Sequence, residues 1–179
     1  MFFYWISWLA ISYFTFFKPK SSRIRAAIIV LLLLNIILIN HYMSLGNLDV
    51  SLPFFYCLIL ILFILLKKRL RVTQLFILCG LILSFVGTRY LLITSPIWLF
   101  FNEYAITSIL LIMMVSFYTK QLNEKLVLFS AAFFIGELFY SMNVRLLDWF
   151  LILGSPIFFI CFYISLVWLL VYDKLAANR

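Results

Sequence analysis

Apolar runs separated by short polar breaks fill the chain. A helix that crosses a bilayer needs about 20 mostly apolar residues, within a range of about 17–25. Divided at its charges and turn-forming residues, the chain gives seven segments close to that length. The predicted helices cover residues 2–17, 26–43, 53–66, 72–89, 97–118, 126–143 and 149–172. The pattern predicts an all-α fold, in which residues 1–179 form a single polytopic transmembrane bundle of seven helices.

Prolines and glycines refine the predicted boundaries. Pro19 is expected to end the first helix and Pro53 to open the third, positions that proline tolerates. Gly154-Ser155-Pro156 falls inside the last predicted helix, where it predicts a kink.

Residues 90–102 are the least regular segment, because Thr94-Ser95-Pro96 interrupts an otherwise apolar run. We interpret the segment as the end of one helix, a tight outer turn and the start of the next helix. A re-entrant or interfacial segment is the alternative here, and a bundle of six helices is the alternative to seven.

Composition supports a membrane protein and excludes two other classes. Hydrophobic residues make up 67% of the chain and charged residues 11%, whereas soluble domains average about 45–50% and about 25%. Fourteen Lys and Arg with six Asp and Glu are too few to cover a soluble protein of this size. The same apolar content excludes a disordered chain.

The basic residues predict the orientation. Twelve of the 14 Lys and Arg lie in the first, third and fifth linkers and in the C-terminal tail, which face one side if seven helices alternate. Basic loops remain in the cytoplasm, so we expect the N-terminus outside and the C-terminus inside. The net charge of +8 follows from these clusters. It does not indicate nucleic-acid binding, which would need one continuous basic face.

Few residues suggest chemistry. Cys57, Cys79 and Cys161 each lie in an apolar stretch, form no metal-binding spacing and are expected to behave as small buried hydrophobes. The chain has one histidine and none of the common hydrolase, metalloprotease or nucleotide-binding motifs. We therefore expect no metal, no cofactor and no enzymatic activity.

Ionisable residues at membrane depth are costly and are functional candidates by default. Glu137 and Glu103 are each predicted about six residues from the outer end of a helix, or about 9 Å deep. Two carboxylates at one level on sequential antiparallel helices are placed to face each other. Arg89 and Arg145 are the available counter-ions, and His41 belongs to the same outer polar set. These five residues form the candidate ligand-binding site.

Glu137 has a structural interpretation beside the functional one. In the structural interpretation, Glu137 pairs with Arg89 or Arg145 and fixes the packing of the helices. The alternatives are that it binds a ligand, an ion or a proton, or that Glu103 or Glu137 faces water near the surface. Ala132 and Gly136 form a small-xxx-small pair that permits close helix approach. This pair suggests that the helix carrying Glu137 is central.

Three short aromatic motifs resemble a known family. They are Phe2-Phe3-Tyr4-Trp5-Ile6-Ser7-Trp8, Ser95-Pro96-Ile97-Trp98 and Gly136-Glu137-Leu138-Phe139-Tyr140. Together they resemble the YphA-like membrane proteins of Bacillus-type bacteria over nearly the whole chain. That family has no assigned activity, so the resemblance implies the topology and a Gram-positive plasma membrane, and it implies no site.

Three functions compete at this stage. The first is a non-catalytic protein that assembles with or regulates another membrane component, with the lipid bilayer as its other partner. The second is a small transporter, channel or solute-binding subunit that uses Glu103 and Glu137. The third, favoured least, is a lipid-modifying enzyme with an outward site around His41, Glu137 and Arg145. The oligomeric state does not follow from these patterns.

Overall fold

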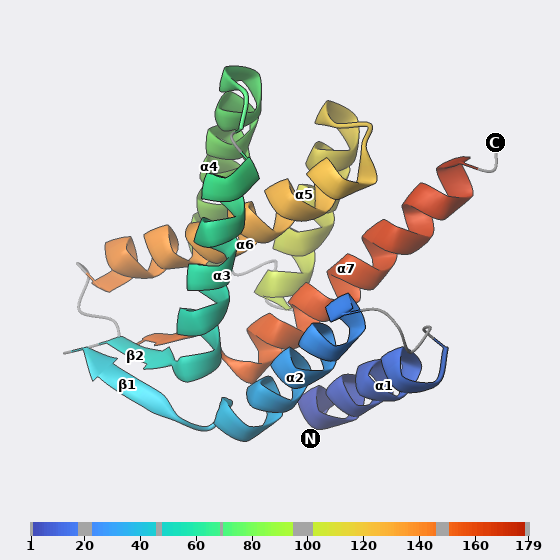
Figure 1. The fold of residues 1–179 in the computed structure, drawn as a ribbon. Coiled ribbons are helices and arrows are strands. Elements are labelled where there is room, and N and C mark those ends of the chain that lie inside the picture. The colour runs from blue at the N-terminus through green and yellow to red at the C-terminus, as the bar shows by residue number, and fades with distance from the viewer. Residues whose placement is uncertain are drawn as a thin grey trace.

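A computed structural model of the chain describes residues 2–17, 23–45, 48–68, 70–94, 102–145 and 151–177. Within these ranges the chain forms seven helices and one small sheet (Figure 1). The helices are α1 (Phe2–Phe17), α2 (Arg23–Leu38), α3 (Leu52–Lys68), α4 (Val72–Thr94), α5 (Glu103–Tyr118), α6 (Leu122–Arg145) and α7 (Pro156–Ala177). The strands are β1 (Tyr42–Leu45), β2 (Leu48–Ser51) and β3 (Leu151–Leu153). The predicted helical bundle of seven segments is therefore confirmed.

The second predicted helix, residues 26–43, is wrong at its end. α2 stops at Leu38, and the chain turns through residues 39–41 into β1. β1 and β2 pair antiparallel with Leu45 opposite Leu48, the register of a two-residue hairpin. β3 then pairs parallel to β2, with Leu48 opposite Leu151. This three-stranded sheet, which the sequence pattern did not predict, joins two connections that are about 100 residues apart.

The predicted start of the last helix at residue 149, with a kink at Gly154-Ser155-Pro156, is also wrong. β3 occupies residues 151–153, and α7 begins at Pro156. Proline fits the first position of a helix because its missing N–H would have no partner there. The Ser155 hydroxyl accepts a hydrogen bond from the Phe158 N–H at 3.3 Å and so caps the helix. The proline opens α7 and does not bend it.

The connection between α4 and α5 is described only at its two ends. α4 continues to Thr94, five residues beyond its predicted end, and α5 begins at Glu103. The Asn102 side chain caps α5 by accepting a hydrogen bond from the Tyr104 N–H at 3.0 Å. Residues 95–101, which decide between a tight turn and a re-entrant segment, lie outside the described residues, as does Pro19.

α6 is the central helix of the bundle. It packs against α3, α4, α5, α7 and β3, and most of its side chains are buried inside the protein. Phenylalanine rings of α6 pack against those of α7. The ring centroids of Phe133 on α6 and Phe158 on α7, for example, are 4.8 Å apart. The central place predicted for the helix that carries Glu137 is what the structure shows.

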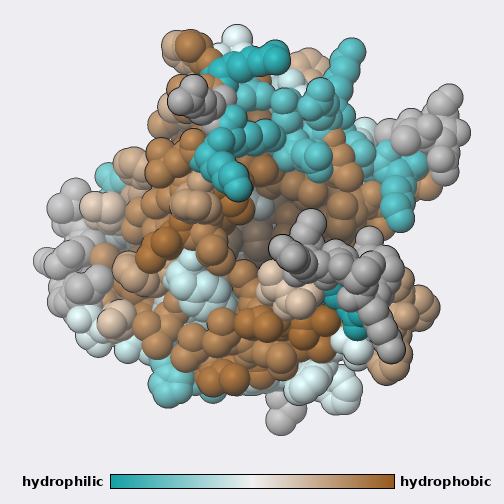
Figure 2. Space-filling view, in the orientation of Figure 1, coloured by the Kyte–Doolittle hydropathy of each residue, from teal (hydrophilic) through white to brown (hydrophobic). Residues whose placement is uncertain are grey.

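The outer surface of the bundle is apolar, as lipid contact requires. Figure 2 shows a hydrophobic surface over the body of the molecule and hydrophilic surface gathered at one end. The end of α3, the start of α4 and the α5–α6 connection lie at that end in Figure 1. They carry the exposed basic residues Lys67, Lys68, Arg71 and Lys120. The sheet lies at the opposite end. Three helices, α4, α6 and α7, are both long and apolar enough to cross a membrane by themselves.

Polar contacts tie the helices together at the basic end. The Lys125 ammonium lies 2.6 Å from the Asp173 carboxylate, which joins the first turn of α6 to α7. The Gln74 amide donates to the Glu124 carboxylate at 2.9 Å, which joins α4 to α6. Lys125, assigned to a linker from the sequence, is thus a buried residue of α6 with its own counter-ion.

Close approach of α4 and α6 depends on Gly136. A Cβ atom at this position would lie 2.7 Å from Cδ1 of the buried Phe85 ring. We expect Gly136→Ala to lower the free energy of unfolding by about 1–3 kcal/mol, since added atoms in a filled core force neighbours to move. Gly87→Ala is the matched control, because no atom lies within 4 Å of its Cβ position on α4. Thermal unfolding in mild detergent measures both, and equal melting temperatures would contradict the expectation.

Candidate functional site

The Arg89 side chain is the centre of the polar cluster in the half of the bundle nearer the sheet. Arg89 lies on α4, five residues before the end of the helix. Its side chain is only 3% exposed, so the guanidinium lies inside the bundle. A charge buried at this depth needs opposite charges close by, because a bare ion in an apolar medium is very costly. α5 and α6 supply these partners.

Two carboxylates flank the guanidinium. Nη1 of Arg89 lies 2.9 Å from Oε2 of Glu103. The two groups form an ion pair, but their geometry does not meet the criteria for a hydrogen bond. Nη2 lies 4.0 Å from Oε1 of Glu137. The Glu137 side chain is fully buried, whereas that of Glu103 is 40% exposed. Glu103 is also the first residue of α5, where the positive end of the helix dipole favours a carboxylate.

Two tyrosine rings complete the surroundings of Arg89. The guanidinium carbon lies 4.0 Å from the centroid of the Tyr104 ring and 4.6 Å from that of Tyr140. A guanidinium in contact with aromatic faces gains cation–π attraction, most when water is excluded. The Tyr104 hydroxyl also donates a hydrogen bond to Oε1 of Glu137 at 2.8 Å. Arg89 is therefore held by contacts from both α5 and α6.

Some polar atoms of the cluster keep unused hydrogen-bonding capacity. Nε of Arg89, Oε2 of Glu137 and the Tyr140 hydroxyl are buried and have no hydrogen-bond partner among the described residues. With both carboxylates ionised, the three charged groups carry one negative charge more than positive. The cluster combines a well-anchored guanidinium with one carboxylate oxygen that is free to accept a proton or a hydrogen bond.

The structure brings together three of the five candidate residues: Arg89, Glu103 and Glu137. Arg145 is the last residue of α6, and its side chain lies outside the described part of the chain. His41 is exposed between α2 and β1, where its backbone bonds Leu38 and Leu52 and no described contact joins its side chain to the cluster. Arg89 is the counter-ion that the described residues show.

Tyr104 is the member of the cluster that sequence analysis missed. It follows Glu103 directly, and a polar aromatic residue beside an acidic one is a weak signal in a chain with 10 tyrosines. Tyr140 was more accessible to prediction, since it lies three residues after Glu137 and shares its helix face. Both tyrosines lie against Arg89 because α5 and α6 pack on α4.

The cluster shows no recognisable catalytic or metal-binding arrangement among the described residues. No group of three or more His, Cys, Asp or Glu side chains there is placed to hold a metal ion. The acidic pair shares a single guanidinium, and the rings of Tyr104 and Tyr140 contact that guanidinium. Contacts of this kind connect α4, α5 and α6 directly.

A family model, described as YphA-like integral membrane protein, matches residues 1–178. The chain belongs to this family. The YphA-like family predicted from the three aromatic motifs is thus confirmed, and the apolar helices of the structure are those of an integral membrane protein. No curated protein and no solved structure matches the chain. Family membership assigns no molecular function, so the function is argued from the geometry of the polar cluster.

Proposed function

We propose that this YphA-like protein is a non-catalytic component of the plasma membrane that assembles with, or regulates, another membrane component. One observation carries the proposal: the buried Arg89 guanidinium lies 2.9 Å from Glu103, 4.0 Å from the buried Glu137 and against two tyrosine rings. Charges in direct contact fix helix packing. If the polar residues serve to hold the helices together, the surface left to contact a partner is the lipid-facing one.

The proposal includes an orientation and a membrane. The sheet, with the N-terminus of α1, faces the outside, and the basic ends of α3 and α7 face the cytoplasm, as expected where basic loops remain inside. Figure 1 supports this because the start of α1 lies at the same end of the bundle as the sheet and the end of α7 lies at the opposite end. The membrane is proposed to be the plasma membrane of a Gram-positive bacterium, as the family resemblance implies.

Site-specific photo-crosslinking in intact cells tests the partner. Benzoylphenylalanine is placed at one exposed position on each of four helices: Ile37, Leu83, Ile109 and Val167. We expect a crosslinked protein of one constant mass from only one of the four helices. Benzoylphenylalanine at the next exposed position on the same helix face should give the same adduct. Phe85 is the buried control and should give none. Lipid adducts alone from all four faces would overturn the proposal.

A proton or solute pathway through the cluster is the second candidate, and a specific observation favours it. Glu103 is 40% exposed, and Arg89 links it to the buried Glu137, whose Oε2 has no partner among the described residues. Proteoliposomes loaded with a pH-sensitive dye test the proton pathway directly. Proton entry that Glu137→Gln abolishes and Glu124→Gln preserves would support this candidate. Entry no faster than in protein-free liposomes would exclude it.

A further inference from the structure

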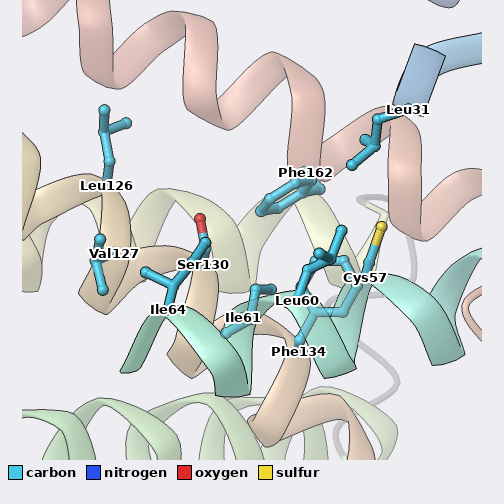
Figure 3. A pocket seen from close by; sticks show the side chains of 10 residues that line it. All are labelled: Leu31, Cys57, Leu60, Ile61, Ile64, Leu126, Val127, Ser130, Phe134 and Phe162. Carbon is cyan, nitrogen blue, oxygen red and sulfur yellow. The ribbon is translucent and has the colours of Figure 1, made fainter. Parts of the chain in front are cut away.

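An apolar groove lies between α3 and α6 (Figure 3), and none of its lining residues belongs to the polar cluster. α3 and α6 form its long walls, and α2 and α7 contribute one residue each. The lining residues are Leu31, Cys57, Leu60, Ile61, Ile64, Leu126, Val127, Ser130, Phe134 and Phe162. Figure 3 shows Leu126 and Ile64 toward one end and Leu31 and Cys57 toward the other. The groove therefore runs along the helices and not across them.

The dimensions of the groove match one hydrocarbon chain in one leaflet. Its volume is about 320 Å³, at the lower end of the roughly 300–1,000 Å³ range of ligand sites. From Leu126 to Phe134 the α6 wall rises eight residue steps, or about 12 Å at 1.5 Å per residue. Half of a bilayer core is about 15 Å thick. Almost all of the lining is apolar, so a hydrocarbon chain would meet no unpaired polar group except the Ser130 hydroxyl.

One end of the groove is basic. The α3 positions that line it, Cys57, Leu60, Ile61 and Ile64, recur every three or four residues, so they share one face of the helix. Continued by one turn, the same face reaches Lys67 and Lys68 in the last turn of α3. Both lysines are exposed and form no ion pair with a described residue.

Lys125 lies beside the groove on α6, but its charge is already used. Its ammonium pairs with Asp173 and is largely buried. Among the described basic residues on the two helices that wall the groove, the unpaired charges nearest its lining positions are thus those of Lys67 and Lys68 on α3. Basic residues at a cytoplasmic opening between transmembrane helices are typical of sites for anionic lipid head groups.

We infer that the α3–α6 groove binds one acyl chain of an anionic phospholipid whose phosphate lies against Lys67 and Lys68. Chain and head group are recognised separately, the chain by the apolar walls and the phosphate by the two ammonium groups. The lipid would fill the space that α3 and α6 leave between them and so would belong to the folded protein in its membrane.

Native mass spectrometry tests the inference on protein reconstituted in nanodiscs with equal amounts of phosphatidylglycerol and phosphatidylcholine, and then released in mild detergent. Leu60→Trp fills the groove, and Leu62→Trp is its matched control, since the two leucines are both 42% exposed on α3 and only Leu60 lines the groove. Ile64→Trp, one turn further on, is a second filling variant.

We expect the unchanged protein and Leu62→Trp to retain one phosphatidylglycerol, and Leu60→Trp and Ile64→Trp to lose it. The Lys67→Gln/Lys68→Gln variant should lose the preference for phosphatidylglycerol over phosphatidylcholine by about thirtyfold, the effect of two lysines near a lipid surface. Lys120→Gln/Lys174→Gln removes the same charge elsewhere and should keep the preference.

Three results would overturn the inference. The first is no retained lipid, or equal loss in Leu60→Trp and Leu62→Trp. The second is retention without preference for the anionic lipid. The third is a dimer that Leu60→Trp dissociates, which would make a second copy of the chain the occupant of the groove.

Discussion

Arg89→Gln is expected to lower the free energy of unfolding by about 3–5 kcal/mol, the largest loss of any single polar substitution in the chain. Removing one partner of a buried ion pair leaves the other charge uncompensated. Here the remaining charge is that of Glu137, which is fully buried. The Tyr104 and Tyr140 rings would also lose the cation between them. Unfolding by denaturing detergent, followed by circular dichroism, measures the loss.

Glu103→Gln and Glu137→Gln separate the contributions of the two carboxylates. Glu103 is 40% exposed, so its substitution should cost only about 0–1 kcal/mol, as for other solvent-accessible pairs. Arg89→Gln/Glu137→Gln should be more stable than Arg89→Gln alone, because the uncompensated carboxylate is gone. Equal stability of the double and the single variant would show that Arg89 and Glu137 are not coupled.

Gly154→Ala is expected to cost about 3 kcal/mol, the second large effect. Gly154 has φ of +69°, a left-handed conformation that costs other residues about 1–2 kcal/mol. A Cβ atom there would also collide with Phe54 and with the Ser51 hydroxyl, which donates a hydrogen bond to the Gly154 carbonyl at 2.8 Å. Overpacking of this kind adds about 1–3 kcal/mol. The substitution therefore strains the junction of β3, α3 and α7.

Gly80→Ala is the control for this prediction, since nothing lies within 4 Å of its Cβ position. It should leave the melting temperature unchanged or raise it slightly, because alanine favours a helix over glycine. A Gly154→Ala protein as stable as Gly80→Ala would contradict the strained junction between the sheet and α7.

The helices were predictable because lipid imposes a simple rule on sequence. Every backbone polar group in a membrane must be bonded within the protein, so long apolar runs become helices. The first predicted segment, residues 2–17, agrees with α1 (Phe2–Phe17), and the third, residues 53–66, lies within α3 (Leu52–Lys68). Charges marked other ends less well, because Arg89 and Lys125 lie inside α4 and α6 and not between helices.

The sheet could not be found from hydropathy alone. Tyr42–Leu45 and Leu151–Leu153 are as apolar as the helices that they adjoin. The dipeptide Gly46-Asn47 between two short alternating segments was an available hairpin signal. The parallel pairing of β2 with β3 had no local signal, because it joins residues about 100 positions apart.

The polar cluster was predictable in its charges but not in its aromatic contacts. Ionisable residues at membrane depth are costly, so Glu137 was identified from its depth, and Arg89 was one of the two counter-ions predicted for it. The Arg89 guanidinium contacts the rings of both Tyr104 and Tyr140. These contacts depend on the orientation of α5 and α6 about their own axes. Rotation is decided by packing of the whole core, and packing cannot be read from the spacing of residues along one helix.

The roles proposed for the polar cluster and the groove depend on the proposed orientation, with the sheet outside and the basic helix ends in the cytoplasm. Labelling with a membrane-impermeant maleimide tests it most directly, after Cys57, Cys79 and Cys161 are replaced with Ala. Ser44→Cys on β1 and Lys174→Cys on α7 place one exposed thiol at each end. We expect Ser44→Cys to react in intact cells and Lys174→Cys to react only after permeabilisation. Reaction of both thiols from the same side would contradict the seven-crossing orientation.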